Sequence, residues 1–427
     1  MSLVEVGLVA LVITAFALVS GRLAKMWITP PMIFVTFGAI VGPDGLGAID
    51  ISIESETVKV IAEITLALLL FTDAARINIP RLRAEHGMPK RMLGFGMPLT
   101  IVLGAVFALA LFSDLGVWAA LLVATILAPT DAALGQAVVT SDRVPVRVRQ
   151  ALNVESGLND GIAAPLVVIF ASLAIPKVEA LSAVDSFREI VQQIGFGLLI
   201  GGVLGIAVGL LGRASAERNW IDNVFGQLGV LTLAIGAWAF ASAAGGSGFI
   251  AAFICGLAFG SVDRDPEPIT EFTESGGQLL NLVVFAIFGG VFVGPAVSAL
   301  TWQVALYAVL SLTVVRMIPV AISLTGLGLR RDTVFFVGWF GPRGLASIVF
   351  GLVVLEQAGF TVASDLFAGV TCTVLLSVFA HGLTAHPLSD WYGKITKSEL
   401  DAVVEGEPVS EEIRFRHVPR PLRKFKG

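Results

Sequence analysis

Charged residues are scarce in this chain. Asp, Glu, Lys and Arg make up 14% of its 427 residues, against roughly 25% in soluble globular proteins. Cysteine is scarcer still, and Cys255 and Cys372 both lie inside apolar runs, which argues against a disulfide framework. Hydrophobic residues reach 56%, and the mean hydropathy is +0.86. The composition therefore excludes an ordinary soluble domain and predicts a polytopic membrane protein.

Apolar runs long enough to cross a membrane recur along the chain. A crossing of about 30 Å needs about 20 helical residues. About thirteen runs fit, at residues 3–20, 27–42, 57–73, 92–113, 116–139, 150–174, 190–212, 224–244, 247–261, 277–296, 299–325, 333–355 and 365–386. The second run holds Pro30 and Pro31 and is expected to be broken or irregular. The predicted fold class is an all-α polytopic membrane protein with about 13 transmembrane helices.

Basic residues fall mostly in every second loop. With the N-terminus outside, the inner loops hold Arg22, Lys25, Arg76, Arg81, Arg83, Lys90, Arg91, Arg143, Arg147, Arg149, Arg213, Arg218, Arg264, Arg330 and Arg331. The outer side has only Lys59, Lys177 and Arg188. This excess predicts an outside N-terminus and a cytoplasmic C-terminus. Residues 387–427 turn polar and are expected to form a cytoplasmic tail, whose basic end at 414–427 we interpret as solvated.

Two carboxylates within one apolar run need an explanation. Residues 151–165 contain Glu155, Asn159 and Asp160 among small apolar residues. A carboxylate at the centre of a membrane helix costs about 2.5 to 3.5 kcal/mol on insertion scales. The carboxylates of Glu155 and Asp160 must therefore have partners or a function. We expect Asp160 to carry a cation and a proton in turn.

Polar groups from three runs are predicted to reach a similar depth. Asp160 lies eleven residues, about 16 Å of helix, from the boundary residue Arg149. Asp131 and Arg343 each lie twelve residues, about 18 Å, from an arginine at the same boundary. All three side chains are thus expected near the middle of the bilayer.

The spacing around Asp160 suits a cation site. Ser156 and Asp160 are four residues apart and share one helix face. Gly157 and Gly161 form a neighbouring stripe, which lets another backbone approach closely. A carboxylate, a hydroxyl and backbone carbonyls are the oxygen ligands that hard cations take.

Two runs are predicted to be discontinuous helices. Pro129 interrupts the fifth crossing, and Thr130 and Asp131 after it are good N-cap residues for a second half-helix from Ala132. Carbonyls freed before the break can face a cation. Gly341, Pro342, Arg343 and Gly344 break the twelfth crossing at similar depth. Broken helices at corresponding positions of two halves indicate the central site of a transporter.

The motifs APTDAAL, NVESGLNDG and GPRGLASIV, in this order, strongly resemble those of the monovalent cation/proton antiporters, specifically NhaP-like sodium/proton antiporters of the CPA1 branch. The likeness covers residues 1–386. It implies an inverted repeat, a homodimer, a core (about 92–174 and 299–386) that moves against a scaffold (about 1–73 and 190–296), and a bacterial cell membrane location. No cofactor besides the transported ions, no nucleic-acid partner and no enzymatic activity are expected.

The resemblance also implies roles for individual residues. Asp160 would be the cation- and proton-binding carboxylate, with the Ser156 side chain and the Thr130 carbonyl as further ligands. Asn159 stands where the electrogenic branch has a second aspartate, which makes electroneutral one-for-one exchange the expectation. Glu155 would pair with Arg343.

Several further side chains have a structural interpretation beside any functional one. Asp73, near the end of the third crossing, is either an additional ligand or an interfacial residue near Arg76. Asp131 is mainly a helix cap. Arg316 is interpreted as a structural polar group, and His381 and His386 as interfacial anchors rather than pH sensors.

The proposed chemistry is competition for one carboxylate. A proton or a cation on Asp160 excludes the other, and either occupant neutralises the site so that it can cross the barrier. The oxygen ligands do not separate sodium, taken as the first candidate, from lithium or potassium. A sodium-coupled organic anion symporter is the main alternative, followed by a cation channel and an intramembrane aspartyl protease.

Overall fold

Helices account for all the regular structure that is described. The computed structural model describes residues 3–23, 26–49, 55–77, 87–174, 183–262, 267–358 and 364–397, and this part of the chain contains no strand. Eight of its helices are long and apolar enough to cross a membrane, and four shorter apolar helices accompany them. The all-α membrane fold is therefore confirmed. Each apolar run coincides with a helix or with two or three consecutive helices, while the number of crossings stays a prediction.

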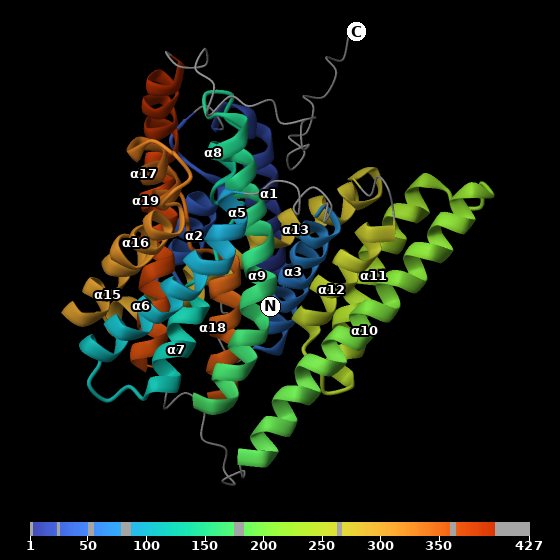
Figure 1. The fold of residues 1–427 in the computed structure, drawn as a ribbon, viewed down its shortest axis with the longest axis horizontal. Helices are drawn as coiled ribbons and strands as arrows, with labels where there is room; N and C mark the ends of the chain where they lie inside the picture. Colours follow the sequence, from blue (N-terminus) through green and yellow to red (C-terminus); the bar gives the residue numbers. More distant parts are fainter. Residues whose placement is uncertain are drawn as a thin grey trace.

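The helices are labelled along the chain in Figure 1. Their bounds are α1 Leu3–Leu23, α2 Pro30–Val41, α3 Glu56–Ala75, α5 Met88–Arg91, the π-helical η1 Met92–Gly96, α6 Met97–Leu111, α7 Val117–Ile126, α8 Gln136–Val139, α9 Val146–Ala174, α10 Ala183–Glu217, α11 Asn223–Ala243, α12 Gly248–Val262, α13 Glu267–Ile287, the π-helical η2 Phe288–Phe292, α14 Val293–Ser298, α15 Trp302–Leu312, α16 Val314–Ser323, α17 Arg331–Trp339, α18 Leu345–Ala358 and α19 Ser364–Lys397.

The second run is shortened rather than broken. Helix α2 begins at Pro30, and Thr29 before it has an extended backbone. A proline in the first helical turn loses no hydrogen bond, because the amide there has no partner within the helix. The expectation of an irregular crossing at Pro30 and Pro31 is therefore wrong. The two prolines start a regular helix of 12 residues.

Glycines bring α12 against α3. A Cβ atom on Gly256 would lie 2.9 Å from Phe71 Cα, and one on Gly260 would lie 2.9 Å from Ala75 Cα. Both distances are too short for a side chain, so the two backbones touch directly. This contact fixes the end of α3 that carries Asp73.

Both predicted breaks are present. Helix α7 ends at Ile126, and the chain runs through turns and extended residues to α8. Helix α17 ends at Trp339, residues 340–344 are not helical, and α18 starts at Leu345. The first break is longer than expected, because residues 132–135 form turns rather than the start of a half-helix.

The last helix is longer than its apolar run. Helix α19 continues through Pro387 to Lys397. Tyr392 on this extension is fully buried, its ring stacks on Phe336 at a centroid distance of 4.3 Å, and its hydroxyl lies 2.9 Å from Thr333 Oγ1. This packing on α17 explains why helix continues into polar sequence. Residues 398–427, including the basic tail, lie outside the described part.

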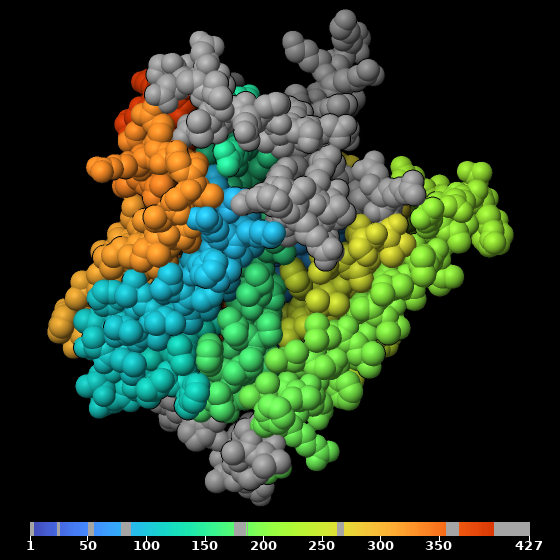
Figure 2. Space-filling view, in the orientation of Figure 1, coloured from blue at the N-terminus to red at the C-terminus, as the bar shows by residue number. Residues whose placement is uncertain are grey.

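Apolar side chains also cover the outside of the bundle. Helix α10 lies along one edge of the molecule (Figure 2), where Leu199, Val203 and Leu210 are 60%, 57% and 55% exposed. Such a surface is stable in a lipid bilayer and not in water.

Candidate ion-binding site

Three polar side chains meet where the first break touches α9. Asn159 Nδ2 donates to Thr130 Oγ1 at 2.7 Å, and Thr130 Oγ1 lies 2.9 Å from Ser156 Oγ. Thr130 and Asn159 are each 2% exposed, and Ser156 is 9% exposed. Because Thr130 Oγ1 accepts from Asn159, its own hydrogen can be donated to Ser156. The predicted residues of α9 and of the break are thus brought together.

Asp160 follows this cluster directly along α9. It lies one turn after Ser156, so the two side chains project from the same side of the helix. Its Oδ1 atom is buried. Asp160 therefore shares a face of α9 with Ser156, whose hydroxyl meets Thr130, and its role as the ion-binding carboxylate stays a prediction.

Asp73 lies against the same stretch of α9. A Cβ atom on Gly157 would lie 3.5 Å from Asp73 Cβ. Gly157 falls between Ser156 and Asp160, so the absence of a side chain there lets Asp73 approach. The structure places Asp73 beside the predicted site, and its role as a ligand stays a prediction.

Asp131 caps a turn and a helix. Its Oδ1 accepts from the amides of Ala133, at 2.7 Å, and Leu134, at 3.3 Å, in the turn at 132–135. Its Oδ2 accepts from the amide of Leu345 at 2.8 Å, at the start of α18. Asp131 therefore caps backbone amides as predicted, but at a turn instead of a half-helix from Ala132, and the cap of α18 is an additional role. Gly344 is the sequence signal for it, because a Cβ atom there would lie 2.7 Å from Asp131 Cβ.

Arg343 donates hydrogen bonds to carbonyls of the first break. Its side chain is fully buried, and Nη1 donates to Ala128 O at 2.6 Å and to Pro129 O at 3.1 Å. Ser347 Oγ donates to Ile126 O at 2.7 Å. The carbonyls of Ala128 and Pro129 therefore face a guanidinium, and Thr130 carries the next carbonyl along the break.

Glu155 pairs with a different arginine from the one expected. Arg316 Nη2 donates to Glu155 Oε2 at 2.8 Å, and Nη1 contacts Oε1 in a bidentate ion pair. The expected pair of Glu155 with Arg343 is therefore wrong. Arg316 reaches Glu155 across the second break, since a Cβ atom on Gly341 would lie 2.7 Å from Arg316 Cζ. Arg316 has the structural role expected of it.

His381 is also placed differently from the expectation. It is 1% exposed, so it is not an interfacial anchor. Because α19 runs on to Lys397, His381 lies well inside the helix. It contacts Ser377 and the carbonyl of Trp339 next to the second break. The sequence signal for this is the spacing of Ser377 and His381, four residues apart on one face.

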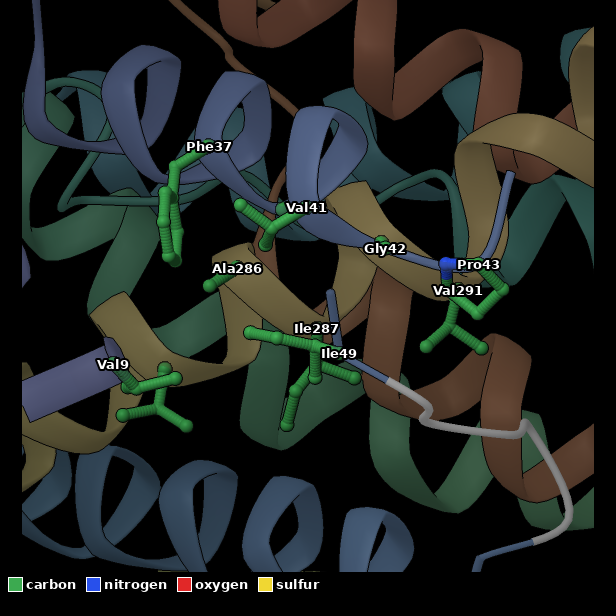
Figure 3. A pocket seen from close by; sticks show the side chains of 12 residues that line it. Val9, Phe37, Val41, Gly42, Pro43, Ile49, Ala286, Ile287 and Val291 are labelled. Carbon is green, nitrogen blue, oxygen red and sulfur yellow. The ribbon is translucent and has the colours of Figure 1, made fainter. Parts of the chain in front are cut away.

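A cavity elsewhere in the bundle has none of the chemistry of this site. It lies between α1, α2 and α13, and its labelled lining includes Val9, Phe37, Val41 and Ile287 (Figure 3). The other lining residues are apolar as well or are glycines. The side chains that line this cavity carry no oxygen, in contrast to Thr130, Ser156 and Asp160.

Comparison with known proteins agrees with these features. The model of the family described as "Sodium/hydrogen exchanger, transmembrane" matches residues 7–391. The Na(+)/H(+) antiporter ApNhaP of Aphanothece halophytica is 29% identical, over 90% of this chain and 77% of that protein. The K(+)/H(+) antiporter NhaP2 of Shewanella oneidensis is 25% identical, over 87% of this chain and 64% of that protein.

A solved structure has the same fold. The sodium proton antiporter MjNhaP1 from Methanocaldococcus jannaschii matches with a TM-score of 0.69 and 21% identity, over 90% of this chain and 100% of that chain. The NhaP-like resemblance of the three motifs is thus confirmed. The family model matches nearly the whole membrane part. The chain therefore belongs to the sodium/hydrogen exchanger family.

Proposed function

We propose that this monovalent cation/proton antiporter binds its cation and its proton in turn at Asp160 and exchanges one for one. The observation that carries the proposal is the cluster of Thr130, Ser156 and Asn159 next to Asp160. It joins the first broken crossing to α9 through hydrogen bonds of 2.7 and 2.9 Å.

The donors of this region suit a hard monovalent cation. The Asp160 carboxylate, the Ser156 hydroxyl and the Thr130 carbonyl are oxygen ligands, with Asp73 as a further carboxylate beside Gly157. Sodium and potassium are the ions named for the two relatives above. We take sodium as the first substrate to test, followed by potassium and lithium.

Exchange follows from the single carboxylate. A proton on Asp160 removes the charge that attracts the cation, and a bound cation occupies the oxygens that the proton needs. Either occupant makes the site neutral, whereas an empty, charged Asp160 is expensive to move through the membrane barrier. The antiporter therefore switches between its outward-facing and inward-facing states when Asp160 holds a proton or a cation, and does not switch when Asp160 is empty.

The permanent charges around Asp160 support electroneutral exchange. Glu155 is compensated by Arg316. Asp131 and Arg343 carry opposite charges. Asp131 accepts a hydrogen bond from the second break, and Arg343 donates one to the first break. These four charges sum to zero, which leaves Asp160 and Asp73 as the acidic side chains beside the cluster. One proton or one cation neutralises the Asp160 carboxylate, and the neighbouring Asn159 carries no charge.

We further propose an outside N-terminus, a cytoplasmic tail, a homodimer and a core that moves against a scaffold. The orientation is supported by contacts among segments predicted to lie inside. Arg143 pairs with Asp390 on the end of α19, and Arg91 donates to Thr325 O. Three basic loops and the last helix thus share one end of the bundle.

The test is cation-driven proton release from proteoliposomes, with the membrane potential clamped and then released. Sodium, potassium and lithium are added in turn to the wild type, to Asp160→Asn and to Asp114→Asn, a change of an exposed carboxylate in the α6–α7 turn. We expect Asp160→Asn to abolish exchange and Asp114→Asn to retain it. The rate of proton release should not depend on the membrane potential.

Robust exchange by folded Asp160→Asn would refute the assignment of this carboxylate. A strong dependence of the rate on voltage would contradict the one-for-one ratio. Sodium-dependent uptake of an organic anion without proton release would support the symporter alternative instead.

A further inference from the structure

We infer that His381 and Ser377 on α19 are positioning residues for the cation site. His381 joins Ser377 to the carbonyl at the end of α17, and together with Ser377 it holds the second break so that Arg343 reaches the carbonyls of the first break. The inference rests on the proposed function and adds residues from a helix that supplies none of the proposed ligands.

His381 links α19 to the end of α17. Its Nε2 lies 2.9 Å from Trp339 O, the carbonyl at the end of α17. Its Nδ1 lies 3.0 Å from Ser377 O and 3.1 Å from Ser377 Oγ. Trp339 is held a second time, because its indole Nε1 donates to Thr384 Oγ1 at 3.0 Å. Helix α19 therefore contacts Trp339, the residue at which α17 ends, through both His381 and Thr384.

Ser377 links His381 to Arg343. The amide of Arg343 donates to Ser377 Oγ at 2.6 Å. The same hydroxyl lies 3.1 Å from His381 Nδ1. Helix α19 is therefore joined to the second break both at Trp339 and at Arg343.

The chain of hydrogen bonds leads from His381 to the proposed ligands. Arg343 Nη1 binds Ala128 O and Pro129 O, and the amide of Asp131 donates to Pro342 O at 2.8 Å. Thr130 lies between these two attachments. A displacement of Arg343 therefore displaces Thr130, whose carbonyl and side chain are part of the site. Cation affinity should depend on Ser377 although Ser377 touches no cation.

The test compares two buried hydroxyls on the same helix face. Ser377→Ala removes the link to Arg343. Thr373→Val is the matched control, because Thr373 lies one turn earlier, is 0% exposed, and bonds only its own helix at Gly369 O. In proteoliposomes we expect Ser377→Ala to raise the apparent KM for the cation roughly tenfold, as expected for one lost buried hydrogen bond. Thr373→Val should change it less than twofold.

Equal KM values for the two variants, with equal amounts of folded protein, would overturn the inference. So would a lower maximal rate for Ser377→Ala with an unchanged KM, since that would indicate a structural role alone. If wild-type protein exchanges no cation, or Asp160→Asn exchanges freely, the proposed function fails. If Asp160→Asn is inactive and Ser377→Ala behaves as wild type, only this inference fails.

Discussion

Arg316 and Arg343 are both buried in crossings, yet their guanidinium groups have different partners. Arg316 forms a bidentate ion pair with Glu155, and its side chain is 4% exposed. Arg343 donates to the carbonyls of Ala128 and Pro129. Removing either cation leaves buried acceptors without a partner, but only Arg316 leaves a buried carboxylate without its counter-charge.

This difference predicts the stability of variants at the Glu155–Arg316 pair. Arg316→Met should lower the free energy of unfolding by about 3 to 5 kcal/mol, because Glu155 then stays buried and charged. The double change Glu155→Gln with Arg316→Met should recover most of that loss. Thermal unfolding in detergent, read with a thiol-reactive dye or tryptophan fluorescence, measures both.

The control for this prediction is a pair on the surface. Arg213 and Glu217 pair on α10 with side chains that are 51% and 65% exposed, so Arg213→Met should cost less than about 1 kcal/mol. If the double variant is as unstable as Arg316→Met alone, the charge argument is wrong.

At the scale of elements, each of the two broken crossings supplies a side chain that caps the other. Asp131, from the first break, accepts from the amide at the start of α18. Arg343, from the second break, donates to carbonyls that follow the end of α7. A helix start carries a partial positive charge and a helix end a partial negative one, so each side chain has the sign that its place requires. The two breaks are therefore one electrostatic unit.

A side chain at Gly344 should disrupt this unit. Gly344→Ala would bring a Cβ atom 2.7 Å from both Cβ and Cγ of Asp131, which forces the two breaks apart. We expect a loss of about 1 to 3 kcal/mol in stability and at least a tenfold fall in exchange rate, measured by thermal unfolding and by proton release from proteoliposomes.

Gly195 on α10 provides the comparison, because a Cβ atom there has nothing within 4 Å. Gly195→Ala should retain full exchange and equal or higher stability, since alanine favours helix. Normal transport by Gly344→Ala would show that the two breaks tolerate separation.

At the scale of the whole molecule, the site lies between the packed helices α3 and α12 on one side and the first break on the other. Helix α12 holds α3 through direct backbone contact at Gly256 and Gly260. Helix α3 in turn presents Asp73 to Gly157 on α9. The hydroxyl cluster comes from the other side, through Thr130. Movement of α3 and α12 relative to the first break would therefore change the surroundings of Asp160 without unfolding a helix.

The orientation of the whole molecule predicts which positions a membrane-impermeant thiol reagent reaches. In a background with Cys255 and Cys372 changed to alanine, Asp114→Cys should react in intact cells. Lys394→Cys, at an exposed position near the end of α19, should react only after permeabilisation. The reverse pattern would place the N-terminus inside and the tail outside.

The sequence by itself determined the local features of this protein. Long apolar runs must become helices in lipid, because backbone groups there have to bond within the segment. Pro129 lacks an amide donor, so the break after α7 and the cap by Asp131 follow from the residues at that place. The equal depth of the motif residues predicted that they meet, and the contacts of Thr130 with Ser156 and Asn159 agree with that.

Only the tertiary structure decided the choice of partners. Glu155 and Arg316 are 161 positions apart, and the sequence offered Arg343 as an equally basic alternative at similar depth. Which guanidinium reaches the carboxylate depends on how α16 crosses α9 and on the space left at Gly341. His381 likewise became a buried link to Arg343 because α19 extends along α17 to Tyr392. Local chemistry fixes where a helix breaks, whereas the crossing of helices decides which side chains meet there.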